Sequence, residues 1–353
     1  MNKEQIVSYN LEKIDEILKS AGKKNVFLLT GASSFKKSGA EAVINGISSD
    51  ICFSRHIVKG SNPKIDEIMP HVKAFSKTGN YDAAIAIGGG SVIDTLKCVK
   101  AFLQEENPII KDLFFIAVPT TAGSGSEATP FAVYYDSDNK KQSIDAPYLL
   151  PDAVVLDSRT AVSIPKYQKA SCAMDAFCQG LESYWTKSAT DVSDSYATKA
   201  MKMILANIRG YMDAPDKSNC EAMQRGAYLA GKAIAVTRTT LSHALSYTIT
   251  SGWGIPHGHA VALTIGSVLK YNIPYIPDDK IAVLKDIFKT DDAYQIPLII
   301  SELMKSAGLE TKLSSMGIDD IEKIANGVNE QRLQNNPVIP SKQDIINILK
   351  EVA

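Results

Sequence analysis

The sequence has almost no excess of either charge, and it lacks long apolar runs. Its 353 residues include 38 Lys and Arg against 39 Asp and Glu, which gives a formal net charge of -1. Proteins that bind nucleic acids through their phosphates concentrate positive charge on one face, so we expect no nucleic-acid partner. No apolar stretch reaches the roughly 20 residues that a membrane-spanning helix needs, so we expect no membrane association.

Cysteine is scarce, and no two cysteines follow the CxxC spacing. An odd and dispersed set of five indicates reduced thiols and predicts a cytoplasmic location. The first 20 residues are polar and amphipathic and lack the apolar segment of a secretory signal, which favours the same location. The cysteines are Cys52, Cys98, Cys172, Cys178 and Cys220.

Several common motifs are missing as well. The GxGxxG fingerprint of dinucleotide-binding folds does not occur. Neither the Ser/His/Asp nor the Cys/His pattern of nucleophilic hydrolases is present, and no internal repeat occurs. Covalent hydrolysis is therefore not expected, and a dinucleotide would have to bind to other glycine-rich loops.

The chain does contain two stretches of different periodicity. Up to about residue 160, short buried strands alternate with helices, which predicts a parallel, doubly wound sheet. Beyond it, helical periodicity dominates, so we predict an α/β domain over 1–160 and an all-α domain over 161–353. The predicted strands cover residues 24–31, 52–58, 82–87, 113–119 and 153–156, and residues 134–157 are otherwise irregular.

Two polar, glycine-rich loops follow predicted strands. Gly88-Gly89-Gly90-Ser91 lies where a strand gives way to a helix, so free N–H groups and the positive end of the helix dipole can receive an anion. The loop Thr120–Glu127 adds hydroxyl groups at the end of the neighbouring strand. Such loops at the carboxyl ends of parallel strands are the expected place for a dinucleotide.

Histidine is rare, and three of the five histidines lie between residues 237 and 259. His243 and His257 are fourteen residues apart, and Pro256 and Gly258 break the helical pattern between them, so both imidazoles can reach one point. Upstream, Asp175 and Gln179 share one face of a helix through their i, i+4 spacing. These residues predict a metal site, although each is also compatible with an ordinary core histidine or an incidental helix pair.

The same segments carry a family resemblance. GGGSVIDTLK at 88–97, PTTAGSGSE at 119–127, the helix of Asp175 and the block from His243 to PHGHA occur in the order seen in iron-containing, or group III, alcohol dehydrogenases. The resemblance implies the dehydroquinate synthase-like fold, with an α/β dinucleotide-binding domain and an all-helical domain. It also implies Fe2+ or Zn2+ in the cleft between them, hydride exchange between NAD(P)H and a small aldehyde or alcohol, and a homodimer.

Carried over residue by residue, the resemblance assigns three sets of residues. The implied metal ligands are Asp175, Gln179, His243 and His257. The implied cofactor-binding residues are Gly31, Ser33, Ser34, Lys37, Gly89, Gly90, Ser91, Asp94, Thr120, Thr121, Ser124 and Lys141, with Lys97 completing the segment of Asp94. The catalytic candidates are His257, Arg238 and His259.

Two positions depart from the family pattern. The family usually has histidine where this chain has Gln179, so either the amide ligates the metal, or a water replaces it, or metal binding has been lost. Tyr247 stands where a second histidine is often found, which removes one proton shuttle. His259 could serve instead, or it could be a residue at the rim of the site.

The remaining residues bear on cofactor and substrate choice. The loop Gly31–Lys37 has no acid to meet a ribose 2′-hydroxyl, and Ser33, Ser34 and one of Lys36 or Lys37 could hold a 2′-phosphate, so we expect NADP(H) rather than NAD(H). The alternative is that both lysines are solvated surface charges.

Arg238 precedes His243 by five residues, and an arginine near a metal site suggests an oxyanion on the substrate. Its alternative role is an interdomain salt bridge. The blocks around Asp175 and His243 look most like phosphonoacetaldehyde reductases (2-hydroxyethylphosphonate dehydrogenases). A reductase of general aldehydes, diols or an octulosonate sugar, or a catalytically inactive nucleotide-binding protein, are the alternatives.

Overall fold

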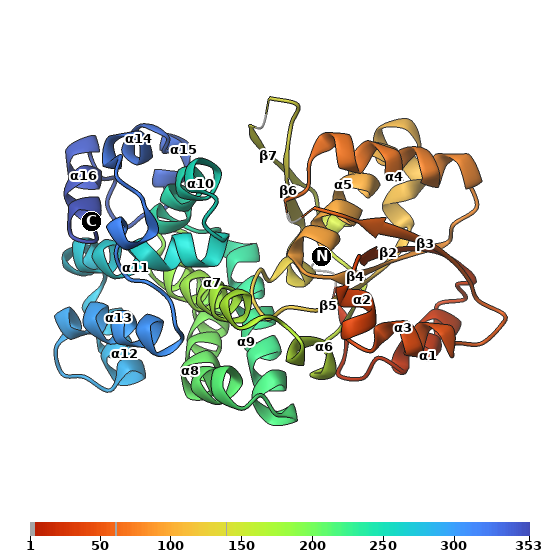
Figure 1. Cartoon of the computed structure of the whole chain (residues 1–353), viewed down its shortest axis with the longest axis horizontal. Coiled ribbons are helices and arrows are strands. Elements are labelled where there is room, and N and C mark those ends of the chain that lie inside the picture. Colours follow the sequence, from red (N-terminus) through yellow and green to blue (C-terminus); the bar gives the residue numbers. More distant parts are fainter. Residues whose placement is uncertain (1–3, 61, 139) are drawn as a thin grey trace. The chain divides into compact units, whose positions relative to one another are not determined.

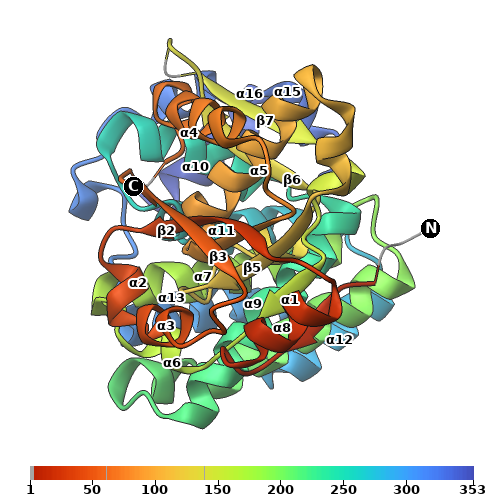
Figure 2. The same ribbon diagram turned by 90° about the vertical axis from the view of Figure 1, so that its right-hand side faces the viewer.

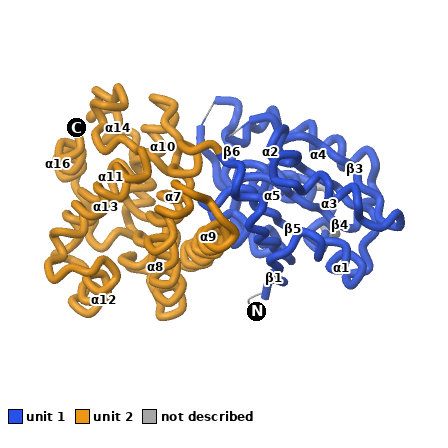
Figure 3. The backbone as a smooth tube through the Cα atoms, turned by 60° about the horizontal axis from the view of Figure 1, so that its bottom comes forward, with its two compact units in different colours: residues 1–164 blue, residues 165–353 orange. Residues whose placement is uncertain are grey.

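The structure, a computed structural model, describes residues 4–60, 62–138 and 140–353. It divides into two compact units, one ending at Ile164 and the other beginning at Pro165 (Figure 3). The sequence suggested a change of character near residue 160. The structure has it a few residues later, within Ser163-Ile164-Pro165, where the first unit gives way to a long helix.

In the described part of the first unit, six parallel strands form one sheet in the order β1-β8-β5-β4-β2-β3. After β2 the chain forms β3 on one side of β2 and then β4 on the other side. The strand order therefore reverses between β2 and β4. The strands are β1 (Ile6–Ser8), β2 (Asn25–Gly31), β3 (Cys52–Val58), β4 (Ala83–Gly88), β5 (Phe114–Pro119) and β8 (Ala153–Val155). The predicted doubly wound parallel sheet is therefore confirmed.

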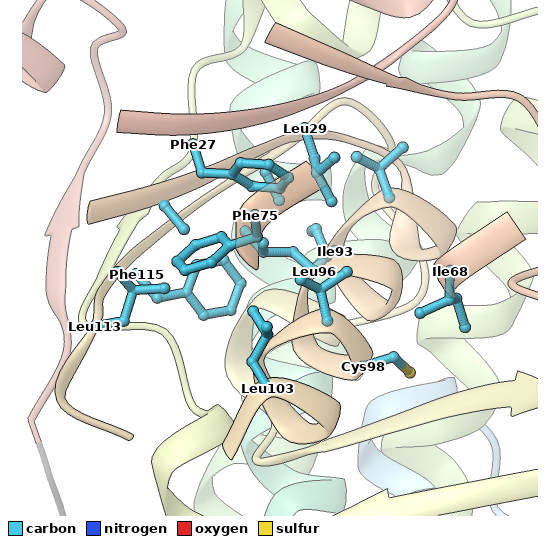
Figure 4. Packing of buried hydrophobic residues seen from close by; sticks show 14 of the residues in the cluster. Phe27, Leu29, Ile68, Phe75, Ile93, Leu96, Cys98, Leu103, Leu113 and Phe115 are labelled. Atoms are coloured by element: carbon cyan, nitrogen blue, oxygen red, sulfur yellow. The ribbon is translucent and has the colours of Figure 1, made fainter. Parts of the chain in front are cut away.

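Successive residues of the central strands feed two different cores, because side chains alternate across a sheet. In β2, Phe27 and Leu29 face the layer of α4 (Ile65–Thr78) and α5 (Gly90–Glu106), whereas Val26 and Leu28 face the opposite layer. Figures 1 and 2 show α4 and α5 on one side of the strands and α1 and α3 on the other. Figure 4 shows the first core, in which Phe27, Phe75 and Phe115 pack beside the apolar side chains of α5. Each such buried side chain contributes about 1.5–3 kcal/mol.

Some elements of the first unit escaped sequence prediction. β1 is a short edge strand with partly exposed residues, and β6 (Phe131–Tyr135) pairs with β7 (Lys141–Asp145) in an antiparallel hairpin inside the stretch predicted to be irregular. Residue 139, which falls in that stretch of the sequence, lies outside the described residues. The remaining helices of the first unit are α1 (Lys13–Ser20), α2 (Ser34–Lys37), α3 (Ala40–Asn45) and α6 (Arg159–Val162).

The second unit is helical throughout its described length, as predicted. Its central helix is α7 (Lys166–Trp185), which is buried along almost all of its length and packs against α8, α9 and α11. Thr190 and Asp216 form capping boxes that fix the starts of α8 and α9. The helices after α7 are α8 (Asp191–Asp213), α9 (Lys217–Thr237), α10 (Leu241–Trp253), α11 (His257–Asn272), α12 (Asp278–Phe288), α13 (Ile296–Ser306), α14 (Ile321–Asn326), α15 (Glu330–Leu333) and α16 (Lys342–Lys350).

Two further properties of the described chain bear on its environment. None of its helices combines the length and the apolar character that crossing a bilayer requires. The five cysteines are all free thiols, and three of them are buried.

Candidate metal centre and cofactor loops

The helical unit brings the predicted metal ligands together from three helices. Asp175 and Gln179 lie one turn apart on α7, and both side chains are buried. His243 lies in the first turn of α10, and His257 is the first residue of α11. The ligand atoms of Asp175, His243 and His257 all lie within 4.8 Å of one another.

The turn between α10 and α11 brings the two histidines to one point. α10 ends at Trp253, because Gly254 adopts a left-handed conformation with φ 71°. Pro256 then precedes α11, and the helix restarts at His257. Gly258 therefore does not break a helix, as the sequence suggested, but lies inside α11. A Cβ atom there would overlap the carbonyl oxygen of Ser171 and lie 2.7 Å from Cβ of Asp175, so only glycine lets α11 approach α7 this closely.

The donor atoms of this cluster are suited to a divalent cation. Oδ1 of Asp175 and Nε2 of His243 lie 3.4 Å apart. Both atoms are buried, and neither has a hydrogen-bond partner among the described residues. Buried polar atoms are almost always satisfied, and a carboxylate oxygen facing two imidazoles is a donor set that iron and zinc accept. The residues present therefore fit the metal that the resemblance implied.

Glu182 fixes the orientation of His243. Its carboxylate is fully buried, faces Nδ1 of His243, and accepts hydrogen bonds from Ser242 N at 2.8 Å and Thr240 Oγ1 at 2.7 Å. This contact leaves Nε2 of His243 directed at Asp175. Burial alone would lower the pKa of His243, but Glu182 and Asp175 outweigh it and raise the pKa to about 9. The surroundings therefore favour a positive charge at this point.

Gln179 lies against the same carboxylate. Burial would raise the pKa of Asp175, but His243, His257 and the hydrogen bond from Gln179 outweigh it and leave the pKa lowered. An ionised Asp175 is the form that binds a metal. Gln179 thus occupies the position next to Asp175 at which the family usually has histidine.

His259, the candidate for proton transfer, lies inside the helical unit and makes several hydrogen bonds there. Its side chain is fully buried, Nδ1 lies 2.9 Å from the hydroxyl of Tyr167, and Nε2 lies 2.8 Å from the carbonyl oxygen of Glu310. The backbone N–H of His259 also donates to Ser171 Oγ. Both ring nitrogens of His259 are therefore engaged in hydrogen bonds within the fold.

Arg238 lies at the C-terminal end of α9 in an unusual conformation. Its φ is 67°, and its side chain is exposed. Two of the three neighbouring threonines make hydrogen bonds within the protein. Thr237 Oγ1 donates to Ser183 Oγ at 2.8 Å, and Thr240 Oγ1 donates to Glu182. These two hydroxyls therefore do not contribute to a substrate pocket.

In the first unit, the predicted cofactor loops follow neighbouring strands. β2, β4 and β5 are adjacent and parallel, so the loops after Gly31, Gly88 and Pro119 leave the same edge of the sheet. The N–H of Thr120 donates to the carbonyl oxygen of Gly88 at 2.9 Å. These loops lie where the strand order reverses, which is the usual dinucleotide position in such sheets.

The two glycine-rich loops touch each other at Gly90. A Cβ atom at Gly90 would overlap Ser124 Oγ and lie 2.7 Å from Ser124 Cβ, so a side chain here would separate the loops. α5 begins at Gly90, and Gly89, Gly90 and Ser91 are partly exposed. Thr121 and Ser124 are also partly exposed, whereas Thr120 is buried. The residues present fit a diphosphate held at the start of α5.

Asp94 and Lys97 lie on α5 and contact the loop and strand that follow β5, with Lys97 buried and Asp94 partly exposed. Lys97 is fully buried, and its Nζ donates to the carbonyl oxygens of Ser126, Thr129 and Phe131 at 2.5–2.8 Å. Burial lowers the pKa of Lys97 to about 8, against the pull of Asp94. Asp94 accepts hydrogen bonds from Ser126 Oγ and the N–H of Val133. Both residues therefore hold the loop after β5 against α5, and the cofactor contact of Asp94 stays a prediction.

The loop after β2 holds the predicted 2′-phosphate residues. Ser33, Ser34 and Lys37 belong to the short helix α2 or its start, and Ser33 and Lys37 are exposed. The structure adds Arg55, whose guanidinium lies 4.3 Å from the ring centre of Phe35 and whose Nε donates to Thr30 Oγ1. Arg55 comes from β3, so no local sequence signal connected it with this loop.

Lys141, the last predicted cofactor residue, lies at the start of β7. Its charge acts on Asp94, whose pKa is raised by burial and partly lowered again by Lys97 and Lys141.

A parallel-sheet unit with glycine-rich loops, together with a helical unit holding Asp/His/His, defines a class of metal-dependent oxidoreductases that use a nicotinamide cofactor. Two family profiles match the chain: "Iron-containing alcohol dehydrogenase" over residues 5–158, and "Fe-containing alcohol dehydrogenase family, C-terminal" over residues 169–353. The chain belongs to the iron-containing alcohol dehydrogenase family.

Individual relatives agree with this assignment. The chain is 30% identical to a sulfoacetaldehyde reductase of Bilophila wadsworthia over 314 residues, 82% of this chain and 81% of that protein. It is 36% identical to a phosphonoacetaldehyde reductase of Streptomyces viridochromogenes over 211 residues, 54% of this chain and 53% of that protein.

Solved structures share the fold. An iron-containing alcohol dehydrogenase of Thermotoga maritima has a TM-score of 0.85 at 28% identity, over 100% of this chain and 98% of that chain. A sulfoacetaldehyde reductase from Bifidobacterium kashiwanohense, in complex with NAD+, has a TM-score of 0.90 at 24% identity, over 99% and 97%. The protein is therefore an enzyme that interconverts aldehydes and alcohols with a nicotinamide cofactor, and its family implies a divalent metal.

Proposed function

We propose that the enzyme reduces a small anionic aldehyde to the corresponding primary alcohol. The substrates we favour are phosphonoacetaldehyde, which would give 2-hydroxyethylphosphonate, and sulfoacetaldehyde. The observation that carries the chemistry is the convergence of Asp175, His243 and His257 within 4.8 Å. The two curated relatives described above support the anionic class, since one is a sulfoacetaldehyde reductase and the other a phosphonoacetaldehyde reductase.

The residues of the helical unit would divide the work at the metal. When bound, a divalent cation supplies Lewis acidity that polarises a carbonyl group. Asp175, His243 and His257 would hold it, with Gln179 as the fourth ligand. Glu182 keeps Nδ1 of His243 engaged, so that Nε2 faces the site. An amide oxygen is a weaker donor than imidazole, so Gln179→His should tighten zinc binding, measured by competition with a chelating dye. Unchanged affinity would remove Gln179 from the ligand set.

For the cofactor we propose NADP(H) over NAD(H). No acid lies in the loop Gly31–Lys37, and Ser33, Ser34, Lys37 and the nearby Arg55 offer donors for a 2′-phosphate. Replacing Ser33 by Asp places a carboxylate where that phosphate would lie, so the ratio of kcat/KM for NADPH over NADH should fall at least about tenfold. A wild-type enzyme that prefers NADH would contradict the proposal directly.

The function is tested with a panel of aldehydes and both cofactors, with and without added iron or zinc. Phosphonoacetaldehyde and sulfoacetaldehyde should give higher kcat/KM than acetaldehyde, butanal and glyceraldehyde. A preference for the neutral aldehydes would favour the alternative of a general aldehyde, diol or sugar reductase. No NAD(P)H oxidation with any aldehyde, in metal-loaded protein, would favour a nucleotide-binding protein without catalysis.

Two further properties stay proposals. The free cysteines are consistent with a cytoplasmic location. A homodimer is expected from the family, and β1, at one edge of the sheet, pairs with β8 alone among the described strands. Light scattering of the purified protein at micromolar concentration measures the oligomer directly, and a monomeric mass would exclude the dimer.

A further inference from the structure

A row of three side chains leads away from the metal ligands within the helical unit. The ring of His257 is nearly parallel to the ring of Tyr247, with 5.8 Å between their centres and 4° between their planes. The guanidinium of Arg332 lies 4.8 Å from the centre of the same Tyr247 ring, and its Nη1 donates to the Tyr247 hydroxyl at 2.8 Å. One tyrosine therefore contacts both a metal-ligand histidine and a cation, and all three side chains are partly exposed.

Arg332 has binding capacity that the fold does not use. Its guanidinium makes no ion pair with a carboxylate of any described residue, and Tyr247 is the only hydrogen-bond acceptor it contacts among them. A guanidinium offers five N–H donors in a planar fork that matches the oxygens of a phosphonate or sulfonate. Most of that fork is therefore available for an oxyanion.

The backbone that carries Arg332 is held firmly. It belongs to the short helix α15, whose residue Leu333 is buried. Just beyond, Asn335 Nδ2 donates to the carbonyl oxygen of Thr237 at 2.6 Å. Asn336 is fully buried and exchanges side-chain hydrogen bonds with Asn272. These contacts fix the position of α15, so Arg332 starts from a rigid base.

We propose that Arg332 is the specificity-determining residue for the anionic end of the substrate, with Tyr247 as its positioning residue. The aldehyde end would lie at Asp175, His243 and His257, while the phosphonate or sulfonate would bind the Arg332 guanidinium beside the Tyr247 hydroxyl. This inference rests on the proposed function, and it takes the oxyanion role from Arg238, the residue that the sequence favoured. Tyr247, a departure from the family pattern, then has a purpose, because its hydroxyl accepts the hydrogen bond that orients Arg332.

The test compares Arg332→Gln, Arg332→Lys and Tyr247→Phe in the metal-loaded full-length enzyme. Substrates are phosphonoacetaldehyde and sulfoacetaldehyde against acetaldehyde and propanal, with kcat and KM measured separately. Arg332→Gln should lower kcat/KM for the anionic aldehydes about 10- to 100-fold, chiefly through KM, and change the neutral ones less than about threefold. Arg332→Lys should retain part of the preference, since it keeps the charge but loses the fork. Tyr247→Phe should cause a smaller loss of the same kind.

The matched control is Arg209→Gln, which removes the same charge from an exposed position of α8 in the same unit. It should leave the ratio of anionic to neutral kcat/KM unchanged. Equal losses on all aldehydes in Arg332→Gln, or a loss of bound metal, would show a structural role and overturn the inference. A variant that keeps the anionic preference would also overturn it, while leaving the proposed function intact. A wild-type enzyme without any anionic preference would remove the proposed substrate class itself, and this inference with it.

Discussion

At the scale of single residues, Glu182 supports the metal site although it is not one of the proposed metal ligands. It is seven residues after Asp175 on the same helix, and its two oxygens bind Thr240, Ser242 and His243. A carboxylate behind a ligand histidine fixes the ring and raises its basicity. The metal centre therefore extends one layer beyond the residues that would touch the ion.

We expect Glu182→Gln to weaken metal binding about 10- to 100-fold, because the amide keeps the shape but loses the charge that faces His243. The measurement is the dissociation constant for zinc, obtained by competition with a chelating dye. Glu302→Gln, which removes a carboxylate from an exposed position of α13, is the control and should leave metal affinity unchanged. Equal affinities of wild type and Glu182→Gln would show that the contact with His243 does not support metal binding.

The sequence suggested the histidines and the carboxylate of this centre but not the residues around them. His243, His257 and the pair Asp175/Gln179 stand out because histidine is rare and the i, i+4 spacing is local. Arg332 lies 75 positions beyond His257 and reaches the site only through the packing of Tyr247, for which the sequence has no local signal. The partners of His259 were also not predictable, because Tyr167 and Glu310, which contact its ring nitrogens, are both remote in sequence.

At the scale of elements, the buried lysine of α5 links a helix to a cofactor loop. Lys97 donates to the carbonyl oxygens of Ser126, Thr129 and Phe131. These hydrogen bonds hold the loop after β5 against α5. Lys100, one turn later, is also buried but donates to the carbonyl oxygen of Leu113, before β5. The two lysines thus hold opposite ends of the same strand.

We expect Lys97→Met to weaken NADPH binding about tenfold and to lower stability, since it removes the donor to three carbonyl oxygens of the loop, and each buried polar group left unsatisfied typically costs about 1–3 kcal/mol. Binding is measured by the change in NADPH fluorescence and stability by thermal unfolding. Lys100→Met should lower stability without a comparable change in NADPH affinity. If both variants bind NADPH as tightly as wild type, the loop does not depend on Lys97.

Two histidines, one on β3 and one on α4, lie close together in the first unit. His56 on β3 stacks on Phe27 with 4.5 Å between ring centres, and His71 on α4 lies 6.2 Å from His56. Burial lowers the pKa of both histidines below the ordinary 6.5, and for His71 the charge of His56 adds to this. Below pH 6.5 the unfolded chain therefore binds more protons at these two histidines than the folded chain does. Their neutral forms favour the folded state above that pH, and this contribution to the unfolding free energy is lost as the pH falls through the folded pKa values.

The corresponding measurement is chemical unfolding between pH 7.5 and pH 5. The unfolding free energy of the wild type should fall over this range more than that of His71→Gln, which cannot take up the proton. Identical slopes in the two proteins would mean that the His56/His71 pair does not contribute to the pH dependence.

The elements themselves were largely predictable where their pattern is strong. β3 was predicted over residues 52–58, the bounds the structure gives, because its run is bounded by turn residues. The hairpin β6–β7 was missed because its partly exposed strands pair only with each other in the described chain and carry polar residues such as Gln142 and Ser143. β1 was missed because it is only three residues long.

At the scale of the whole molecule, the two ligand sets belong to different units. The metal ligands lie in the unit that begins at Pro165, and the glycine-rich loops lie in the unit that ends at Ile164. Binding of the metal should therefore stabilise the second unit, and binding of the cofactor should stabilise the first unit.

We expect removal of metal by a chelator to abolish aldehyde reduction and to lower the melting temperature. Binding at 100 times the Kd adds about 2.7 kcal/mol, which corresponds to a shift of about 5 °C or more for a domain of this size. Glu182→Gln should reduce the shift caused by metal but not the shift caused by NADPH, as followed by differential scanning calorimetry. A loss of both shifts in this variant would contradict their separate origin.

The pairing of β1 with β8 affects how the chain is made. Ile6 lies beside Ala153, so β1 pairs with β8, the strand of the described sheet that is synthesised last. Most of the α/β unit must be synthesised between these two strands before β1 can dock, and contacts of such long sequence separation form slowly. Until then β8 has an unpaired edge, and a chaperone that shields the growing polypeptide would act during that interval.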